Sequence, residues 1–397
     1  MDQAAPHLDI PSTAPALDVD TESLRRELDQ LRDWLESTAG PEDLRHLRKI
    51  ELIGRAASLI GYATAWIAPN PLSIFGMSLG RFMRWTCVGH HVVHKGYERV
   101  EGTPKSRFGA VFARGWRRAI DWFDWIDPAA WHEEHNIQHH YRLNEEADPD
   151  LVERNLSWMR ESKLPRWLRW ALLPLMMASW KFVYYGPSTL EVLAYQEARR
   201  AGETARSMDE ELHERWTGRG LSSFLPKLFN PRIWKRSWGP YLLTFFVIVP
   251  LLFLPLGRWA VLSVLINTLL AEIVTNVHAF IAIVPNHAGS DLYRFEDRTK
   301  GRHEFYLRQI IGSTNYRTGG DFVDLMHGWL NYQIEHHLWP DLSMLQYRRA
   351  QPRVQEICER HGVPYVQESV WKRVYKAAQV MVGDASMLRY PAARDGA

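Results

Sequence analysis

Residues 237–257 read SWGPYLLTFFVIVPLLFLPLG and contain no charged side chain. After Arg258 the chain continues as WAVLSVLINTLLAEIVTNVHAFIAIVP, in which Glu272 is the single charge. A helix needs about 20 apolar residues to cross the hydrocarbon core of a bilayer, and both runs are that long. Arg258 leaves room for only a very short turn between them. We therefore predict a helical hairpin in a membrane over residues 237–284.

A second uncharged segment covers residues 56–80 and carries the tripeptide PNP in its middle. We interpret it as another membrane hairpin with PNP as its turn. Each half is too short to cross the bilayer unless it also includes residues beyond Arg55 or Arg81. A single transmembrane helix is therefore the alternative. The 18 tryptophans fit a membrane protein, because Trp favours the headgroup level of bilayers.

The predicted fold is mainly α: an integral membrane protein with about four transmembrane helices in two hairpins, interfacial helices and a cytoplasmic helical cap. The hairpins cover about 50–90 and 237–284, and the whole membrane domain covers 50–365. We expect residues 1–49 to be a disordered tail followed by an amphipathic helix, in which Leu24, Leu28, Leu31 and Leu35 form one apolar stripe. Residues 366–397 form a C-terminal extension, frayed after Met387.

Composition excludes several classes of function. A net charge of +2 implies no strong affinity for polyanions, so a nucleic-acid partner is not expected. Two cysteines, Cys87 and Cys358, exclude a disulfide framework and a CxxC metal or redox site.

Eight histidines form a pattern that points to metal chemistry. They occur in HHVVH (90–94), where His91 points elsewhere and is not counted, in HNIQHH (135–140), in QIEHH (333–337) and as a single histidine in VPNHAG (284–289). Neutral imidazole is a ligand for iron, zinc and copper, and eight imidazoles are too many for one ion, so we predict two metals. On a helix, the spacing of four in the first two clusters places two histidines on one face.

Shared metals require the clusters to meet on one side of the membrane. The chain must then cross an even number of times between His140 and His287, and the hairpin at 237–284 already supplies two crossings. The apolar part of residues 164–187 is too short to cross, so this segment should lie in the interface. Arg45, Arg48 and Lys49 precede the first apolar segment, which favours a cytoplasmic N-terminus and a site on the cytoplasmic face.

At this point two motifs resemble a known family. NYQIEHHLWP is similar to the third histidine box of membrane fatty-acid desaturases of the acyl-lipid and front-end branch, in which Gln replaces a first His. HNIQHH, followed by Asn144 and Asp148-Pro149-Asp150, also resembles that family. The resemblance covers roughly residues 50–365.

The resemblance implies two iron ions and a set of ligands. The implied ligands are His90, His94, His135, His139, His140, His287, His336 and His337. Gln333 takes the first position of the third box and is included among the metal residues, with a direct or indirect role left open. Some relatives have an Asn one turn before the isolated histidine; Ile283 stands there in this chain, and Asn276 or Asn286 could take its place.

The resemblance also implies an O₂-dependent reaction that introduces a cis double bond into a fatty-acyl lipid or thioester. This sequence lacks the HPGG haem motif of fused cytochrome b5 domains, so a separate electron donor of the ferredoxin or cytochrome b5 type is expected. Candidates for its docking surface are Arg114, Arg117, Arg118, Lys163, Arg166 and Arg169, and candidates for the wall of a substrate channel are Trp122, Trp125, Trp131 and Trp329.

Two alternatives stay open at this stage. One is a hydroxylase or ketolase of the same superfamily acting on a lipid, sphingolipid or carotenoid. The other is a membrane metal-binding protein without catalytic activity. Glu272 is either a partner of a ligand histidine or paired with a polar group at the membrane edge. The remaining histidines considered, His132, His278, His303 and His327, are expected outside the ligand set.

Overall fold

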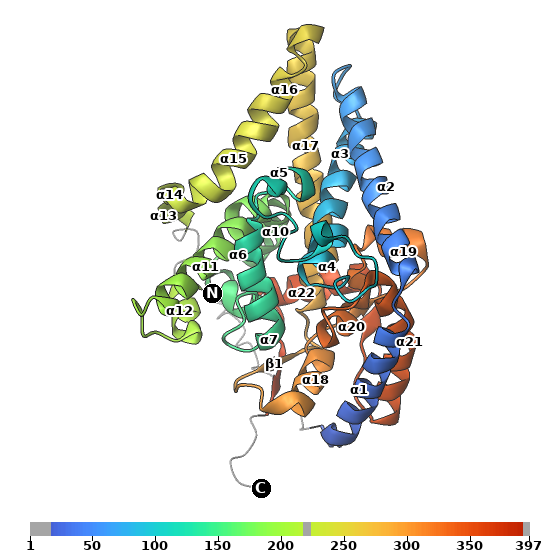
Figure 1. Ribbon diagram of the computed structural model, residues 1–397. Helices are drawn as coiled ribbons and strands as arrows, with labels where there is room; N and C mark the ends of the chain where they lie inside the picture. The colour runs from blue at the N-terminus through green and yellow to red at the C-terminus, as the bar shows by residue number, and fades with distance from the viewer. Residues whose placement is uncertain (1–16, 217–223, 392–397) are drawn as a thin grey trace.

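The computed structural model describes residues 17–216 and 224–391. Almost all regular structure in these ranges is helical, so the mainly α prediction is confirmed. The strands are short: β1 (Tyr293–Phe295) pairs in parallel with β4 (Leu388–Tyr390), and β2 (Asn315–Tyr316) with β3 (Gln367–Glu368). Figure 1 shows two long helical hairpins that project from a larger helical cap. Most of the expected N-terminal tail lies outside the described residues.

The hairpin predicted from residues 237–284 is present. Its first arm is a run of short helical turns from Pro231 to Leu256, and its second arm is α17 (Arg258–Ile283), which continues into η10 (Val284–Asn286). Gly257 forms the turn with a φ of 101°, a conformation that suits glycine because it has no Cβ. Both arms are long and apolar enough to cross a membrane. The turns of the first arm are α14 (Pro231–Ile233), η7 (Trp234–Trp238), α15 (Gly239–Leu242), η8 (Leu243–Ile248), α16 (Val249–Leu251) and η9 (Leu254–Leu256).

The other hairpin consists of α2 (Pro41–Ala65) and α3 (Pro71–Phe82), with PNP in the turn as predicted. Asn70 caps α3 by accepting a hydrogen bond from the Ser73 backbone N–H at 2.8 Å. Neither helix is among those long and apolar enough to span a bilayer, because α2 begins with a charged segment and α3 is short. The prediction of four spans is therefore not confirmed, and two candidate spans are found in the described residues.

A buried polar cluster joins the two hairpins. Glu272 of α17 accepts hydrogen bonds from Arg81 Nη1 at 2.9 Å, from Trp125 Nε1 at 2.6 Å and from the Tyr241 hydroxyl at 2.5 Å. In the ion pair between Arg81 and Glu272, the two side chains are only 9% and 8% exposed. Of the two interpretations of Glu272, the pairing with polar groups is the one found among the described residues, where its contacts include no ligand histidine; its position at the membrane edge stays a prediction.

The helix expected in the first 49 residues is two helices. The chain breaks at Gly40 between α1 (Thr21–Ser37) and α2, because Pro41 cannot continue a helix that precedes it. The predicted leucine stripe is buried, and α1 packs against α18 (Gly301–Ile311) and α21 (Met344–Arg360) of the cap. Figure 1 shows α1 beside α21 along the flank of the cap.

The predicted interfacial segment forms α10 (Arg166–Trp180), which packs on α17 and on α22 (Val370–Val382).

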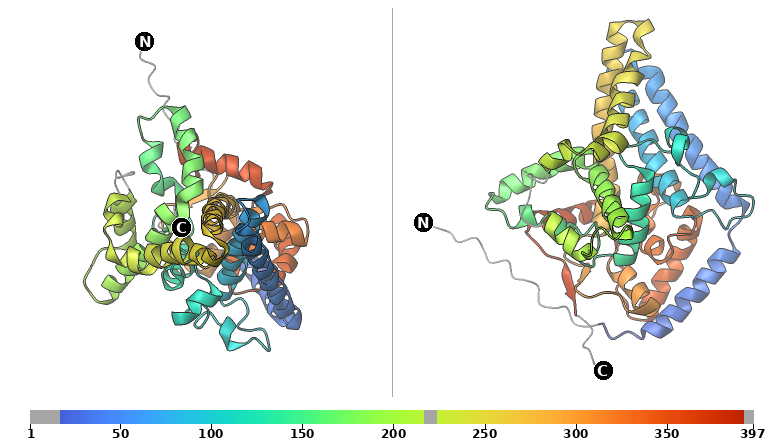
Figure 2. Two further views of the ribbon diagram at one scale, coloured as in Figure 1. Left: turned by 90° about the horizontal axis from the view of Figure 1, so that it is seen from above. Right: turned by 60° about the vertical axis from the view of Figure 1, so that its left-hand side comes forward.

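The prediction of fraying after Met387 is wrong up to Tyr390, because β4 hydrogen-bonds to β1. The cap is completed by η2 (Lys105–Arg107), η3 (Gly115–Arg117), α5 (Arg118–Asp121), α8 (Val152–Asn155), α9 (Ser157–Arg160), η5 (Lys181–Tyr185), α11 (Gly186–Arg200), α12 (Met208–Trp216), α13 (Phe224–Leu228), α19 (Asp321–Met326) and η11 (Leu330–Tyr332). Figure 2 shows from above that these elements spread around the base of the hairpins.

Candidate metal centre

Four segments deliver the histidines to one place in the cap. The first follows α3 directly, through η1 (Met83–Gly89) and α4 (His90–Val93), and the second is η4 (His132–His139) with α7 (His140–Arg142). The third cluster lies on α20 (Gln333–Leu338), and His287 follows α17. Both η1 and η4 are π-helical, a geometry common at functional sites, whereas the sequence predicted ordinary helix.

All eight predicted histidine ligands converge, and they form two groups. The first group contains His90, His94, His135, His140 and His336, and the second contains His139, His287 and His337. Within each group the candidate ligand nitrogens lie within 4.8 Å of one another, and every member is buried. Two compact groups fit the prediction of two metals.

Neighbouring histidines in the chain belong to different groups. His139 and His140 separate in this way, as do His336 and His337, because consecutive side chains on a helix point about 100° apart. His135 and His139, four residues apart, lie one in each of these two groups, but their rings stack at a centroid distance of 5.2 Å and both ligand atoms also lie within 4.8 Å of an Asp150 carboxylate oxygen. The HxxxH spacing thus places His90 and His94 in the same group and His135 and His139 in neighbouring groups, and the ions that they would bind stay a prediction.

The ring nitrogens suit a metal, because many are buried without a hydrogen-bond partner. Both nitrogens of His135 and His140 and one each of His94, His287 and His337 are in this state. Buried polar atoms rarely lack a partner, since losing water without compensation is costly. In addition, His90 Nε2 lies only 2.8 Å from His336 Nε2. Burial lowers the pKa of His140, His336 and His337 well below the usual range, so these imidazoles are neutral donors of a lone pair.

The outer nitrogens of three ligands are held by other side chains. His139 Nδ1 donates to Asp148 Oδ1 at 2.9 Å, and His337 Nδ1 donates to Gln309 Oε1 at 2.8 Å. His336 Nδ1 contacts the Tyr347 hydroxyl at 3.1 Å. These contacts fix the ring orientation and leave Nε2 of each histidine for a metal. Sequence reasoning did not assign these roles, and no local pattern pointed to Gln309 or Tyr347.

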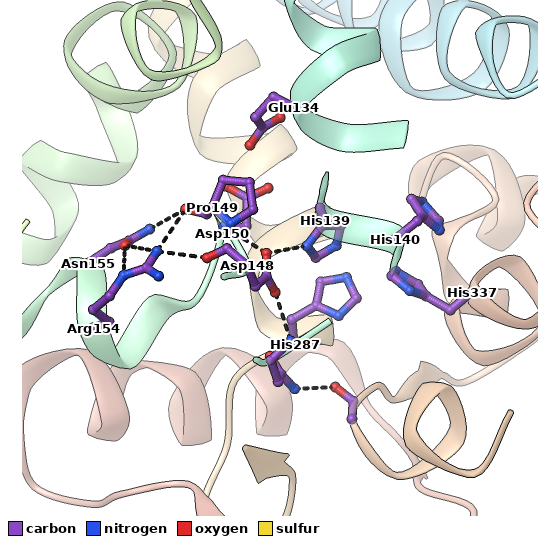
Figure 3. A network of polar contacts seen from close by, with 12 residues as sticks. Glu134, His139, His140, Asp148, Pro149, Asp150, Arg154, Asn155, His287 and His337 are labelled. Atoms are coloured by element: carbon purple, nitrogen blue, oxygen red, sulfur yellow. Dashed lines mark hydrogen bonds and ion pairs between the residues drawn. The ribbon is translucent and has the colours of Figure 1, made fainter. Parts of the chain in front are cut away.

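The Asp-Pro-Asp loop that carries Asp148 is itself held rigidly. Arg154 Nη2 donates to the Asp148 carbonyl at 2.7 Å, and Asn155 Nδ2 donates to the Pro149 carbonyl at 2.7 Å. Asp148 Oδ2 also accepts from the Asn144 backbone N–H at 2.8 Å. Figure 3 shows this loop between Arg154 and the imidazole of His139. Burial lowers the pKa of His139, but the Asp148 carboxylate favours the protonated imidazole, and the pKa is raised on balance.

Replacing Asp148 by asparagine is expected to weaken metal binding in the three-histidine group. The neutral amide no longer favours the tautomer of His139 with its proton on Nδ1, and loss of such a partner lowers metal affinity by about 10- to 100-fold. Metal retained by the purified protein against increasing chelator measures this effect. Asp33→Asn, at an exposed position of α1, is the matched control. Equal retention by both variants would contradict the role of Asp148.

Gln333 lies beside His287, where the structure brings its amide to the edge of the three-histidine group. Its Nε2 is 2.9 Å from His287 Nε2, and its Oε1 accepts from Asn286 Nδ2 at 3.2 Å. Asn286 Nδ2 also faces the Leu330 carbonyl at 3.0 Å, which fixes its orientation. In this arrangement Gln333 presents an N–H donor to the site. Of the two asparagines considered in place of Ile283, Asn286 is therefore the one near the centre, whereas Asn276 bonds to Glu272.

Two acidic groups border the histidines. The Asp150 carboxylate lies within 4.8 Å of the ligand atoms of His135 and His139, and so between the two groups. Glu134 lies beside Asp150 (Figure 3), and the Tyr185 hydroxyl donates to Glu134 Oε2 at 3.5 Å. Burial raises the pKa of Glu134 well above its usual range and that of Asp150 to about 6. The centre is thus not purely histidine, which the sequence did not predict.

The other histidines considered lie outside both groups. His91 Nδ1 faces the Cys87 carbonyl at 2.9 Å, and His278 Nε2 faces the Met326 carbonyl at 2.7 Å while its ring stacks on Phe82. His132, His303 and His327 are likewise absent from the two groups of the described chain.

An apolar cavity of about 460 Å³ leads to the centre. At its inner end it touches His90 and His135 of one group and His139 and His287 of the other. Its apolar wall comes from α8, α9 and the residue between them, from α10 and η5, from the end of α17 with η10, and from Met381 of α22. The residues are Val152, Leu156, Trp158, Leu172, Leu175, Met176, Trp180, Val183, Phe280, Ile283 and Val284.

The tryptophans proposed as channel walls are elsewhere. Trp122, Trp125, Trp131 and Trp329 are buried but do not line this cavity. Trp131 instead stacks on His135 at a centroid distance of 4.5 Å. Trp158 and Trp180 line the cavity in their place, which the sequence could not show because the wall depends on how α10 docks.

The basic residues proposed for donor docking do not form one unpaired surface. Arg117 pairs with Asp121, Arg118 with Asp127 and Arg166 with Asp384. Arg169 donates to the Val382 carbonyl. These pairings neutralise much of the charge on which the docking prediction depended, and docking stays a prediction.

Comparison with known proteins places this architecture among lipid-modifying enzymes. A profile of the family described as fatty acid desaturase matches residues 64–369. The NADPH-dependent stearoyl-CoA 9-desaturase of Mycobacterium tuberculosis (strain CDC 1551 / Oshkosh) is 24% identical over 371 residues, 90% of this chain and 78% of that protein. The acyl-lipid (7-3)-desaturase of Diacronema lutheri is 25% identical over 336 residues, 80% of this chain and 64% of that protein. The Delta(8)-fatty-acid desaturase of Euglena gracilis is 33% identical over 106 residues, 27% of this chain and 25% of that protein.

Proposed function

The chain belongs to the fatty acid desaturase family and is an oxidoreductase of that type, and on this premise we propose that it introduces a cis double bond into a long fatty-acyl chain at a two-iron centre. One observation carries the proposal: the apolar cavity ends at histidines of both metal-binding groups. A chain lying in the cavity therefore reaches the centre with its methylenes and not with a polar head. Membership of the family argues against a protein without catalytic activity.

The two groups of histidines would hold the irons. His90, His94, His135, His140 and His336 would hold one, and His139, His287 and His337 the other, with Gln333 beside them. Bound iron supplies the reduction of O₂ and the oxidising power that removes hydrogen from carbon. The neutral ligand set suits this redox role better than zinc hydrolysis, which uses fewer ligands.

The chain's own residues position the substrate and keep the site dry. Aliphatic and aromatic side chains of α10 and α17 exclude water along the cavity and limit the paths that an extended acyl chain can take. Three imidazoles near the end of the cavity keep their orientation through hydrogen bonds to Asp148, Gln309 and Tyr347. Burial favours the protonated form of Glu134, and the neighbouring Asp150 lines the cavity beside the histidines.

We propose that the centre faces the cytoplasm. The basic residues before α2 favour that side for the N-terminus. The α2–α3 hairpin has exposed apolar side chains at its tip, among them Leu59, Ile67, Leu72 and Phe75, as the candidate spans do along their length. We propose that this hairpin also enters the bilayer, which preserves the even number of crossings. Electrons would come from a separate ferredoxin or cytochrome b5 type of protein.

Expression in a host without such enzymes, followed by fatty-acid profiling, tests the reaction. We expect a new unsaturated fatty acid whose mass is lower by two hydrogens, with one double-bond position fixed by the cavity. An oxygen-containing product of unchanged unsaturation would replace this proposal with the hydroxylase. Profiles equal to those of the empty host, from protein that contains iron, would contradict both.

Filling the cavity is expected to reduce product without removing iron. Ser179→Trp places a large ring in the wall of the cavity, and displacing a substrate by about 1 Å can cost on the order of a hundredfold in rate. Product per iron-loaded enzyme measures the effect, and Ser37→Trp at an exposed position of α1 is the matched control. If both variants keep full activity, this cavity does not hold the substrate.

A further inference from the structure

The cavity opens to the outside beside α10. Among the described residues that line it, Leu175 alone is exposed, with 67% of its surface accessible. Leu172, Met176 and Ser179 continue the same face of the helix inward, toward the histidines. Leu175 therefore marks the mouth of the cavity. Pro174, which precedes it, removes one backbone hydrogen bond from the helix and makes the turn at the mouth easier to deform.

α10 and α22, which pack against each other beside the cavity, carry large exposed apolar side chains. Trp167 and Leu175 of α10 are 69% and 67% exposed, and Trp371 and Tyr375 of α22 are 67% and 56% exposed. We name these four residues the rim. The two helices are held together by the Arg166–Asp384 ion pair at 2.8 Å. Figure 1 shows α10 and α22 at about the level of α4, where the first hairpin enters the cap.

The rim has the composition of a membrane interface. Lys163 and Lys372 are exposed cations on the same two helices or next to them, and Lys372 lies 3.9 Å from Glu368. Trp and Tyr with flanking Lys and Arg are typical of the headgroup level, where aromatic rings sit at the boundary and long cationic side chains reach phosphates. A soluble protein partner would have to cover this surface and still leave the cavity open. A lipid leaflet covers the surface and also contains the acyl chains that can enter the cavity.

The rim is also continuous with a candidate membrane span. The C-terminal end of α10 is fixed to α17, because Trp180 Nε1 donates to the Asn276 carbonyl at 2.9 Å and the Lys181 backbone N–H donates to Asn276 Oδ1 at 3.0 Å. Asn276 lies one turn beyond Glu272, toward the end of α17 that carries the centre. Since α17 is long and apolar enough to cross the bilayer, α10 leaves it near the level where the hydrocarbon core ends.

We propose that the rim rests in the headgroup region of a leaflet, and that the acyl chain of a bilayer lipid enters the cavity laterally past Leu175. This rests on the proposed function and deepens it, because it assigns the substrate to a lipid in the membrane instead of a thioester from the aqueous phase. The aromatic residues hold α10 at the depth of the lipid carbonyls. The chain then bends from the leaflet into the cavity without passing through water.

Site-specific quenching tests the surface independently of activity. Cys87 and Cys358 are both buried, so a cysteine placed at Leu175 can be labelled selectively with a small fluorophore. In phosphatidylcholine vesicles that contain 5-doxyl phosphatidylcholine, fluorophores on Leu175→Cys and Trp371→Cys are expected to lose most of their emission. A fluorophore on Glu356→Cys, at an exposed position of α21, should keep its emission. Equal, weak quenching at all three positions would overturn the proposal, and Trp371→Cys decides if Leu175→Cys does not fold.

The carrier is tested with the iron-loaded enzyme and its electron donor. One arm uses vesicles of phosphatidylcholine with deuterated stearoyl chains, and the other uses deuterated stearoyl-CoA with vesicles of unlabelled lipid. We expect label to be desaturated at least tenfold faster in the first arm, and Leu175→Glu to slow that arm by placing a charge at the mouth. Turnover confined to stearoyl-CoA would overturn lateral entry while leaving the desaturase function intact. No turnover in either arm would count against the function itself.

Discussion

Replacing His336 or His337 by alanine is expected to remove one iron each and to abolish turnover, although the two residues are adjacent. His336 belongs to the five-histidine group and His337 to the three-histidine group, so each substitution leaves the other group complete. Loss of a side chain that only holds a ligand histidine lowers metal affinity or activity by about 10- to 100-fold. Loss of the ligand itself should have a larger effect, so turnover should fall by at least about a hundredfold. Iron per chain should fall from two toward one in each variant and toward zero in the double variant.

Elemental analysis of purified protein and product formation measure these outcomes together. His303→Ala is the control, because His303 is a partly exposed histidine of α18 outside both groups. It should keep two irons and full turnover. Loss of all iron in either single variant would show one interdependent centre instead of two separable sites. Full iron in both would show that the histidines of the third box do not hold it.

Replacing Glu272 by alanine is expected to cause the largest loss of stability. Arg81 would keep its charge in a buried position without its partner, and breaking a buried ion pair in this way costs about 3–5 kcal/mol. Trp125 and Tyr241 would each lose an acceptor as well. The midpoint of thermal unfolding in detergent should therefore fall sharply, and less protein should be recovered in the folded state.

The matched comparison removes both charges together. In Arg81→Met with Glu272→Met no isolated charge stays buried, so the double variant should be markedly more stable than Glu272→Ala. Exposed Glu356→Ala should leave the midpoint unchanged. If the double variant is no more stable than the single one, the ion pair is not what joins the two hairpins.

The parts of the fold that were predicted correctly depend on local signals. Three features depend on a single element each: the uncharged run of 20 residues, the PNP turn and the leucine stripe of α1. They could be predicted without knowing which other elements pack against them. The break at Gly40–Pro41 was also encoded locally, but the long charged pattern on both sides obscured it. The four-span prediction is not confirmed, because α2 and α3 are shorter or more charged than a span and depend on packing against α17.

The side chains around the centre show the limit of sequence reasoning. Gln309 holds His337 from a distance of 28 residues along the chain, and no spacing rule connects them. Trp158 and Trp180 line the cavity, whereas the tryptophans nearer the histidine clusters do not. These roles follow from the docking of α10 and α18 against the centre, and docking depends on whole surfaces.

The eight histidines that converge and the apolar arm 258–286 could be identified from the sequence, because ligand chemistry and apolar length belong to residue types and short spacings. How the histidines divide into two groups depends on the packing of segments far apart in the chain. His90 meets His336 across 246 residues, while the adjacent His336 and His337 separate into different groups. The same is true of the cavity, whose exposed lining residue Leu175 belongs to α10, a helix that packs on both α17 and α22.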